Sequence, residues 1–293
     1  MKLLHERYRI VSHMTEGGQG SLYVVFDQQS ASHKMAKLYR YRPSRFLTPF
    51  FDADIKSKPG SSILEKVQQK LSWMSPQLRL QSFLKYQYRQ LNMLNHSGIL
   101  FPEEIILKEP YCIIMRLIKG GTLRSVLREK GRLTLEETGF YLAQLANILN
   151  YLHSNKVVHR DIKPENILID SQGEIFLSDF DFAHFRAGWP RDYLLSSHYR
   201  NKGTGNYMSP EHLRGAVPHS GMDIYSTATM IYEALSGELP FGKPIKNRDD
   251  TRNFKSIITL NKQQNETILQ ALNPNPSKRT ACILKFYSDL FSN

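Results

Sequence analysis

The stretch His159-Arg160-Asp161-Ile162-Lys163-Pro164-Glu165-Asn166 lies between two segments with different apolar patterns. Before it, Thr134 and Glu137 form a capping box and leucines at helical spacing follow, which predicts a long buried helix ending near Ser154. After it, the apolar run at 167–169 predicts a short strand. The pattern His-Arg-Asp-x-Lys-x-x-x-Asn thus places five polar residues in one short loop, and chance is a poor explanation for it.

The elements around this loop predict a strand-rich first part and a helix-rich second part. Leucines from Leu80 onward suit a further helix, and a Gly-rich turn at 17–20 joins the first two long strands. The expected strands span residues 8–13, 21–27, 33–39, 105–107, 111–115, 167–169 and 175–177, and the later helices span residues 222–236 and two shorter segments beyond. This order is typical of an α+β protein with two lobes, which we place at residues 1–118 and 119–293.

Composition limits the class of protein. The chain has 293 residues, of which 41% are hydrophobic and 23% charged, so it can bury a sizeable core and is unlike a disordered chain. It contains no apolar run of membrane-spanning length, and charges interrupt its first residues where a secretory signal needs an apolar stretch. With only Cys112 and Cys282 it offers no disulfide framework or zinc cluster. We therefore expect a cytoplasmic protein.

The formal net charge of +12 is concentrated in one segment. Between Lys34 and Arg89 there are twelve lysines and arginines against three acids. Prolines and a Pro-Gly pair break the pattern inside it, so we interpret about 41–80 as an insertion. A solvated surface segment explains this charge, and contact with a polyanion, either nucleic acid or acidic lipid, is the alternative. Salt-sensitive binding that is lost when Arg40, Arg42 and Arg45 are neutralised would favour the alternative.

Several motifs together resemble the eukaryotic-type serine/threonine protein kinases. The stretch at 159–166 resembles their catalytic loop, and Asp179-Phe180-Asp181 stands where the family has Asp-Phe-Gly. A Gly-rich turn at 17–20 is followed by Lys37 in Met35-Ala36-Lys37, like the family's phosphate-covering loop and its lysine. The run 203–211 ends in Ser-Pro-Glu for the usual Ala-Pro-Glu. The resemblance covers nearly the whole chain and implies a bilobal kinase fold, with a small β-rich N-lobe and a larger helical C-lobe.

The resemblance also implies roles for single residues. Asp161 would accept or orient the proton of the substrate hydroxyl, and Lys163 would neutralise charge on the transferring phosphoryl group and mark serine/threonine specificity. Asn166 and Asp179 would hold Mg²⁺ through oxygen atoms. The residues implied for binding ATP are Gly17, Gly18, Gly20, Leu22, Met35, Lys37, Met115, Leu117 and Leu168.

Further roles concern activation and structure. Kinases with an arginine before the catalytic aspartate, here Arg160, are often switched by a phosphate on the activation segment. The candidates for phosphorylation are Ser196, Ser197 and Thr204, of which Thr204 is the one expected to contact substrate. The structural residues implied are Glu211 and its partner Arg279, Asp223 as a brace for the catalytic loop, and Gln87 as the partner of Lys37.

Three positions depart from the family pattern. Thr15 replaces the first glycine of the phosphate-covering loop, and Gln87 stands where a glutamate pairs with the lysine. An amide can bond an ammonium group but supplies no countercharge, so this pair would be weaker. Asp181 replaces the glycine of Asp-Phe-Gly, and we expect it to stiffen the segment because aspartate tolerates positive φ less freely than glycine.

The leading prediction is an active kinase that transfers the γ-phosphate of ATP, with Mg²⁺, to serine or threonine hydroxyls of protein substrates. The departures motivate one alternative, a pseudokinase or weakly active scaffold that binds nucleotide. A small-molecule phosphotransferase is a further alternative, but the peptide-docking elements of the segment that ends at 203–211 argue against it. Because phosphoryl transfer depends on positioning and charge, retention of Lys37, Asp161, Lys163, Asn166 and Asp179 favours activity.

Overall fold

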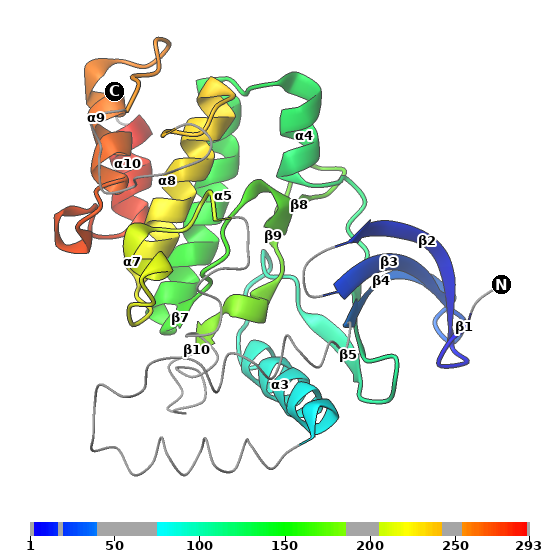
Figure 1. Ribbon diagram of the computed structural model, residues 1–293. Helices are drawn as coiled ribbons and strands as arrows, with labels where there is room; N and C mark the ends of the chain where they lie inside the picture. Colours follow the sequence, from blue (N-terminus) through cyan, green and yellow to red (C-terminus); the bar gives the residue numbers. More distant parts are fainter. Residues whose placement is uncertain (1–2, 17–19, 40–74, 186–204, 242–253, 292–293) are drawn as a thin grey trace, which may run out of the picture. The chain divides into compact units, whose positions relative to one another are not determined.

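The computed structural model describes residues 3–16, 20–39, 75–185, 205–241 and 254–291, and they fall into two compact units. Of these residues, the first unit contains those up to 95 together with 100–117. The second unit contains 96–99 and the described residues from 118 onward. The first is dominated by strands and the second by helices (Figure 1). The predicted α+β, bilobal fold class is confirmed.

The first unit is built on one antiparallel sheet with the strand order β1-β2-β3-β4-β6-β5. The strands are β1 (Leu3–Leu4), β2 (Tyr8–Glu16), β3 (Gly20–Asp27), β4 (Ser32–Tyr39), β5 (Pro102–Ile106) and β6 (Cys112–Arg116). In this register Lys37 of β4 lies opposite Leu22 of β3 and Ile113 of β6. The sheet therefore carries Lys37 between two apolar neighbours.

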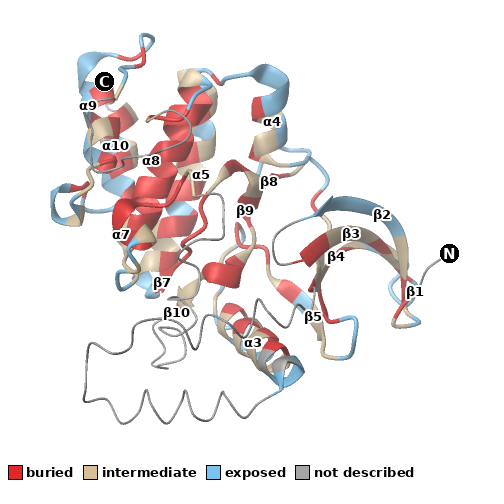
Figure 2. Ribbon diagram, in the orientation of Figure 1, coloured by how far each residue is buried: buried red, intermediate tan, exposed pale blue. Residues whose placement is uncertain are grey.

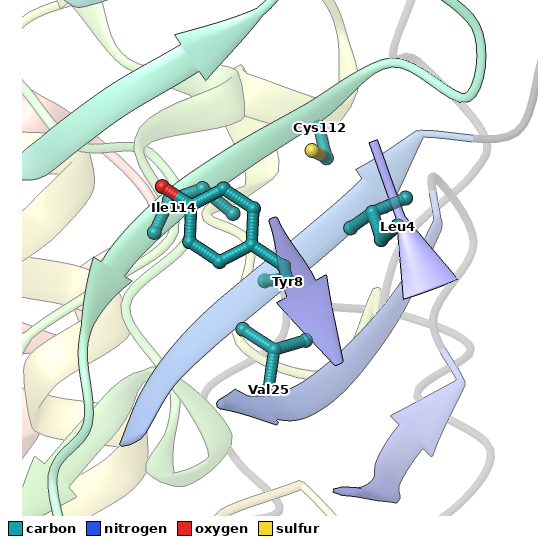
Figure 3. Close-up of a cluster of buried hydrophobic side chains, with 6 residues drawn as sticks. Leu4, Tyr8, Val25, Cys112 and Ile114 are labelled. Atoms are coloured by element: carbon teal, nitrogen blue, oxygen red, sulfur yellow. The ribbon is translucent and has the colours of Figure 1, made fainter. Parts of the chain in front are cut away.

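One face of the sheet is closed by a small apolar core. Leu4, Tyr8, Val25, Cys112 and Ile114 come from four strands and pack against one another (Figure 3). All five are at most 3% exposed. Because β1 and β2 supply Leu4 and Tyr8, this core ties the beginning of the described chain to the rest of the sheet.

Helix α3 (Pro76–Leu91) packs on the same unit. It begins after Ser75, whose hydroxyl accepts a hydrogen bond from the Leu78 amide, with proline at a position where a missing N–H costs nothing. Leu80 and Leu84 are fully buried against Tyr39, Tyr111 and Ile113. The buried face of α3 thus contacts aromatic and apolar side chains of the sheet.

The second unit is built on two long helices, α5 (Leu135–Ser154) and α8 (Ser220–Ser236), which lie side by side in Figure 1. Every residue of α8 from Met222 to Leu235 is buried, and Figure 2 shows the helix almost entirely in the colour of buried residues. The other helices are α4 (Leu123–Lys130), α7 (Pro210–Leu213), α9 (Lys262–Ala271) and α10 (Ile283–Phe291). Because a helix buried on all sides is shielded from water, most of its polar side chains must find partners within the protein.

Short elements form the loops of the second unit. The strands are β7 (Val157–Val158), β8 (Ile167–Ile169), β9 (Ile175–Leu177) and β10 (His184–Phe185), and the 3₁₀ turns are η3 (Pro164–Asn166), η4 (Phe180–Phe182) and η6 (Pro276–Lys278). β8 pairs with β9, and β7 pairs with β10, both antiparallel. The loop 159–166 therefore leaves β7 and enters β8, while β9 leads into η4.

The predicted elements that fall in the described ranges are present, but several of their ends differ, and the helices α4 and α7 and the short strands β1, β7 and β10 were not predicted. β5 begins at Pro102 rather than at 105, because a proline fits the start of a strand at the sheet edge. The leucine pattern that begins at Leu80 predicts a helix as far as Leu94, but α3 ends at Leu91. Most of the predicted insertion at 41–80 lies outside the described residues. No helix in the described ranges combines the length and apolar character that crossing a membrane requires.

We expect Phe286→Ala to lower the free energy of unfolding by about 3–5 kcal/mol. The Phe286 ring of α10 is fully buried where α10 packs on α5 and α9, so truncation leaves a cavity. Leu284→Ala on the same helix is the control, because that side chain is 39% exposed and its loss should cost less than about 1 kcal/mol. Chemical denaturation measures both, and equal losses would contradict the packing described.

Candidate active site

A buried carboxylate fixes the backbone of the loop 159–166. Asp223 of α8 is fully buried and accepts hydrogen bonds from the backbone amides of His159 at 2.9 Å and Arg160 at 2.7 Å. A third bond comes from Nε2 of His153 on α5, at 2.8 Å. The structure thus contains the brace predicted for Asp223. His153 was missed by sequence reasoning, because a lone histidine at a helix end gives no signal of its partner.

Arg160 holds a backbone conformation that this brace supports. Its φ is 69°, in the left-handed region that costs a non-glycine residue of order 1 kcal/mol or more. Its buried guanidinium donates to the Phe182 carbonyl at 3.4 Å and to Nε2 of His212 at 3.1 Å. The turn at Arg160 aims the next residue, Asp161, while Arg160 itself connects the loop to η4 and α7.

Asp161, Lys163 and Asn166 meet at one carboxylate oxygen. Oδ2 of Asp161 accepts hydrogen bonds from Nζ of Lys163 at 2.7 Å and from Nδ2 of Asn166 at 2.9 Å. Nδ2 of Asn166 also donates to the Asp161 carbonyl at 2.8 Å. Both of these side-chain contacts use Oδ2 of a largely buried carboxylate, and neither uses Oδ1.

The groups around Asp161 have opposing effects on its pKa. Burial raises the pKa of Asp161 above its ordinary value, the Lys163 ammonium group opposes this rise, and the negative charge of Asp179 adds to it. Asp179 is therefore within electrostatic reach of Asp161. A cation bound beside both carboxylates would relieve this repulsion.

Asp179 sits at a sharp turn after β9. Its backbone has φ 62° and ψ 71°, and its side chain accepts from the Asp181 amide at the start of η4. Phe180 is buried and packs edge-on against the His159 ring, with centroids 4.7 Å apart. His159 in turn contacts the Ser178 carbonyl through Nε2 at 3.1 Å. The loop 159–166 and the turn at Asp179 are thus packed together within the second unit.

Our expectation for Asp181 assumed that this position needs a positive φ, but the structure places the positive φ at Asp179. The residue with positive φ in this turn is Asp179, whereas Asp181 is buried in the 3₁₀ turn and is not among the described residues with positive φ. Asp181 therefore does not need glycine's freedom in this conformation. Whether it stiffens the segment stays a prediction.

The donor set fits Mg²⁺ better than a softer metal. Since Nδ2 of Asn166 is committed to Asp161, its amide oxygen Oδ1 is the atom that would bind a cation, and Asp179, whose charge acts on Asp161, would supply a carboxylate oxygen. Nowhere in the described ranges do three or more His, Cys, Asp or Glu side chains gather as a metal cluster. Mg²⁺ commonly takes one or two protein oxygens and completes its shell with water and phosphate, which matches this sparse set.

A second charged cluster, absent from our sequence prediction, connects four parts of the second unit. Arg124 of α4 donates to Glu165 of the loop at 2.7 Å and to Glu233 of α8 at 2.9 Å. The Tyr207 hydroxyl lies between Arg124 and Glu233 and bonds both. Burial, together with the Glu233 carboxylate, raises the pKa of Tyr207 well above its usual range, so it stays a neutral donor. The residues of this cluster are far apart in the sequence, so no local sequence pattern predicts their contacts.

The ion pair predicted between Glu211 and Arg279 is present. Nη1 and Nη2 of Arg279 approach the two carboxylate oxygens of Glu211 at 2.8 and 3.1 Å, and both side chains are buried. Arg279 also donates to the carbonyls of Gly221 and Asn273. Burial alone would raise the pKa of Glu211, but the hydrogen bonds and charge of Arg279 hold it below its ordinary value.

The candidate nucleotide-binding residues of the first unit lie on three adjacent strands. Gly20 is tightly placed in β3, since a Cβ there would lie 2.0 Å from the Leu38 carbonyl oxygen. Leu22 lies two residues further along β3, Met35 and Lys37 lie on β4, and Met115 lies on β6. Leu117 follows β6, and Leu168 belongs to β8 of the second unit. Their roles toward ATP stay predictions.

Two of the departures from the family pattern can be placed in the first unit. Thr15 is exposed near the end of β2, opposite Leu22. Gln87 is only 3% exposed on α3. It continues the buried stripe formed by Leu80 and Leu84.

Some predicted residues fall outside the described ranges. These are Gly17 and Gly18 of the Gly-rich turn and Ser196, Ser197 and Thr204 of the activation segment, together with nearly all of the basic insertion, including Arg40, Arg42 and Arg45. Their roles, and contact of the insertion with a polyanion, stay predictions.

Comparison with known proteins identifies the family. The model of the protein kinase domain matches residues 85–291, which include the loop 159–166, Asp179 and the Glu211–Arg279 pair. The chain belongs to the protein-kinase family. The match begins inside α3, so Lys37 and the Gly-rich turn of this kinase lie before it.

Curated relatives of this kinase are named as protein kinases. A CBL-interacting serine/threonine-protein kinase 9 from Arabidopsis thaliana is 30% identical over 202 residues, and a CBL-interacting protein kinase 24 from Oryza sativa is 27% identical over 263 residues. These alignments cover 67% and 86% of the chain. A cGMP-dependent protein kinase from Plasmodium berghei is 36% identical over 149 residues, 51% of the chain. The chain spans 44%, 56% and 16% of the three relatives, respectively.

We expect Arg279→Met to lower the free energy of unfolding by about 3–5 kcal/mol at pH 7, because it leaves the buried Glu211 carboxylate without its arginine partner. In the wild type the lowered pKa of Glu211 gives stability that is present above its unfolded pKa near 4.5 and lost as the pH falls through the folded pKa. In the variant, burial alone raises that pKa, so the difference between the two proteins should shrink below about pH 4.5.

Denaturant unfolding of both proteins at pH 7 and pH 4 measures this difference. Lys285→Met is the matched control, because Lys285 forms an exposed pair with Asp289 and its loss should cost within about 0.5 kcal/mol at either pH. A deficit in Arg279→Met that does not change with pH would show that packing and carbonyl contacts, rather than the ion pair, dominate.

Proposed function

We propose that the chain is a serine/threonine protein kinase that transfers the γ-phosphate of ATP, with Mg²⁺, to hydroxyls of protein substrates. The observation that carries this proposal is the convergence of Lys163 and Asn166 on Oδ2 of Asp161, in a loop held by Asp223. Phosphoryl transfer needs positioned charges more than covalent chemistry, and this arrangement supplies them. The relatives named as serine/threonine kinases support the same class of reaction.

In this proposal each residue of the site has a separate role in phosphoryl transfer. Oδ1 of Asp161 orients the substrate hydroxyl, whose oxygen forms a bond to the γ-phosphorus while the bond from that phosphorus to the bridging oxygen of ADP breaks. The hydroxyl proton passes to Asp161, whose raised pKa suits it to receive one. The Lys163 ammonium lies 2.7 Å from Oδ2 of the same carboxylate, and it stabilises negative charge on the phosphoryl group during transfer. Mg²⁺ at Asn166 and Asp179 would neutralise phosphate charge.

The two alternatives differ in what they require. A pseudokinase needs no intact proton acceptor, yet Asp161, Lys163 and Asn166 keep close hydrogen-bonded geometry. A small-molecule phosphotransferase needs no peptide-docking segment, yet Tyr207 at the end of that segment is tied to Arg124 and Glu233. Both observations favour a protein kinase. The free thiols Cys112 and Cys282 suit a reducing compartment, and we propose the cytoplasm.

We also propose that a phosphate on the activation segment raises activity. Arg160 supports this proposal, because its guanidinium is buried beside His212 and next to η4, where it would attract a phosphate. Ser196→Ala combined with Ser197→Ala should then lower activity at least about tenfold and remove autophosphorylation from this segment. A kinase assay with phosphosite mapping measures both, with Ser288→Ala on α10 as the control. Unchanged activity and phosphate content would refute regulation through these serines.

Asp161→Asn should reduce phosphate transfer to generic protein substrates by about 10²–10⁴-fold while leaving nucleotide binding within a few fold. The amide keeps the shape of the side chain but cannot accept the hydroxyl proton. A radiolabelled-ATP assay with Mg²⁺ measures transfer, and Asp289→Asn on the surface of α10 is the matched control. If wild type transfers no phosphate although it binds nucleotide, the chain is a pseudokinase.

A further inference from the structure

Lys37 and Tyr39 form a contact within β4. They are two residues apart and so point to the same face of the sheet. Nζ of Lys37 lies 5.3 Å from the centroid of the Tyr39 ring, within the range in which an aromatic face attracts a cation. Tyr39 is only 5% exposed, so the contact is largely shielded from water on the tyrosine side.

The Tyr39 ring is fixed by its surroundings. Its backbone amide donates to the Tyr111 carbonyl at 2.9 Å, and across the ladder it faces Gly20. The ring packs with Leu80 and Leu84 of α3 in a buried cluster. A ring held by both the strand and the helix presents its face to Lys37 without a further cost in side-chain entropy on binding.

Helix α3 provides no negative charge for Lys37. The helix contains no aspartate or glutamate, but it contains the basic residues Arg79, Lys85 and Arg89. At the buried position where the family places a glutamate, it has the neutral amide of Gln87. A charge from this helix therefore cannot orient the ammonium group, whatever hydrogen bonds Gln87 makes.

We propose that Tyr39 is a positioning residue for Lys37, and that its ring takes over the orienting role of the glutamate absent from α3. The face of the ring attracts the ammonium through its quadrupole and carries no net charge. Unlike a carboxylate, the neutral ring does not offset the positive charge that Lys37 would present to nucleotide phosphates. This inference rests on the proposed role of Lys37 in binding the phosphates of ATP, and it is new in assigning a function to Tyr39.

A role in core packing alone would give the same burial of Tyr39, so the test must vary the ring's electrostatics and keep its shape. Phenylalanine and its mono-, di- and trifluoro derivatives are introduced at position 39 by amber suppression. Fluorine weakens the negative face of the ring stepwise at nearly constant size. ATP affinity, measured by titration in the absence of Mg²⁺ so that no phosphate is transferred, should fall steadily along the series, by about 5- to 30-fold in total.

A second readout follows Lys37 itself. The rate at which an acyl-phosphate derivative of ATP labels Lys37, measured by mass spectrometry at saturating probe, should fall along the same series because the ammonium is held less firmly. Both readouts are independent of phosphate transfer. If they follow the series while no transfer occurs, the inference stands and the proposed kinase activity fails.

Substitutions provide the matching controls. Tyr39→Phe should stay within about twofold of wild type, whereas Tyr39→Leu should show the full loss. Tyr111→Leu removes a similarly buried ring of the same cluster and should lower the unfolding midpoint without a comparable loss in ATP affinity. In a Gln87→Glu background, the restored carboxylate should reduce the effect of Tyr39→Leu to less than about threefold. A flat fluorine series, or equal losses for Tyr39→Leu and Tyr111→Leu, would overturn the proposal.

Discussion

The fully buried carboxylate of Asp223 is the constraint on which the second unit depends. A charge without solvent contact is tolerated only when hydrogen bonds replace water, and Asp223 obtains them from the amides of His159 and Arg160 and from His153. Burial alone would raise its pKa, but the bond and charge of His153 hold it below its ordinary value. Asp223 therefore stays ionised, and the loop backbone must stay where its two amides can reach the carboxylate. Arg160 can keep its left-handed backbone conformation because the hydrogen bonds to Asp223 outweigh the energetic cost of its positive φ.

The same helix organises the rest of the site. Ten residues after Asp223, Glu233 of α8 bonds Arg124 and Tyr207, and between them Ser226 donates to the Tyr207 carbonyl at 2.9 Å. The loop 159–166, the end of the activation segment and α4 thus all take their positions from polar side chains on one buried helix. Buried ion pairs add little net stability compared with apolar packing, but breaking one is costly, so they specify one arrangement. For a reaction that depends on positioned charge, such specification matters more than added stability.

The sequence predicted those features whose signal is local. The capping box at Thr134 and the leucine spacing marked α5, and the dense polar pattern marked the loop that brings Asp161, Lys163 and Asn166 together. The Glu211–Arg279 pair was accessible only through the family resemblance, since 68 residues separate its members. The cluster around Arg124 was missed because its contacts span 41 to 109 residues and arginines on helix surfaces are common. Backbone dihedrals were equally inaccessible, so the positive φ at Asp179 rather than Asp181 came only from the structure.

Two of the three departures from the family pattern, Thr15 and Gln87, lie in the first unit, and the third, Asp181, lies in the second unit beside Asp179. The groups that we propose to handle developing charge, namely Asp161, Lys163, Asn166 and Asp179, belong to the second unit and match the family pattern. Thr15 and Gln87 belong to the first unit, whose proposed task is to hold a nucleotide rather than to react with it. A buried carboxylate at Gln87 would have to be desolvated within an apolar stripe, whereas an amide at this position carries no such charge penalty. An aromatic ring can also orient an ammonium group, and burying a neutral ring costs less than burying a carboxylate. The role of positioning a lysine can therefore pass to a different kind of side chain, whereas proton transfer and metal binding require particular groups.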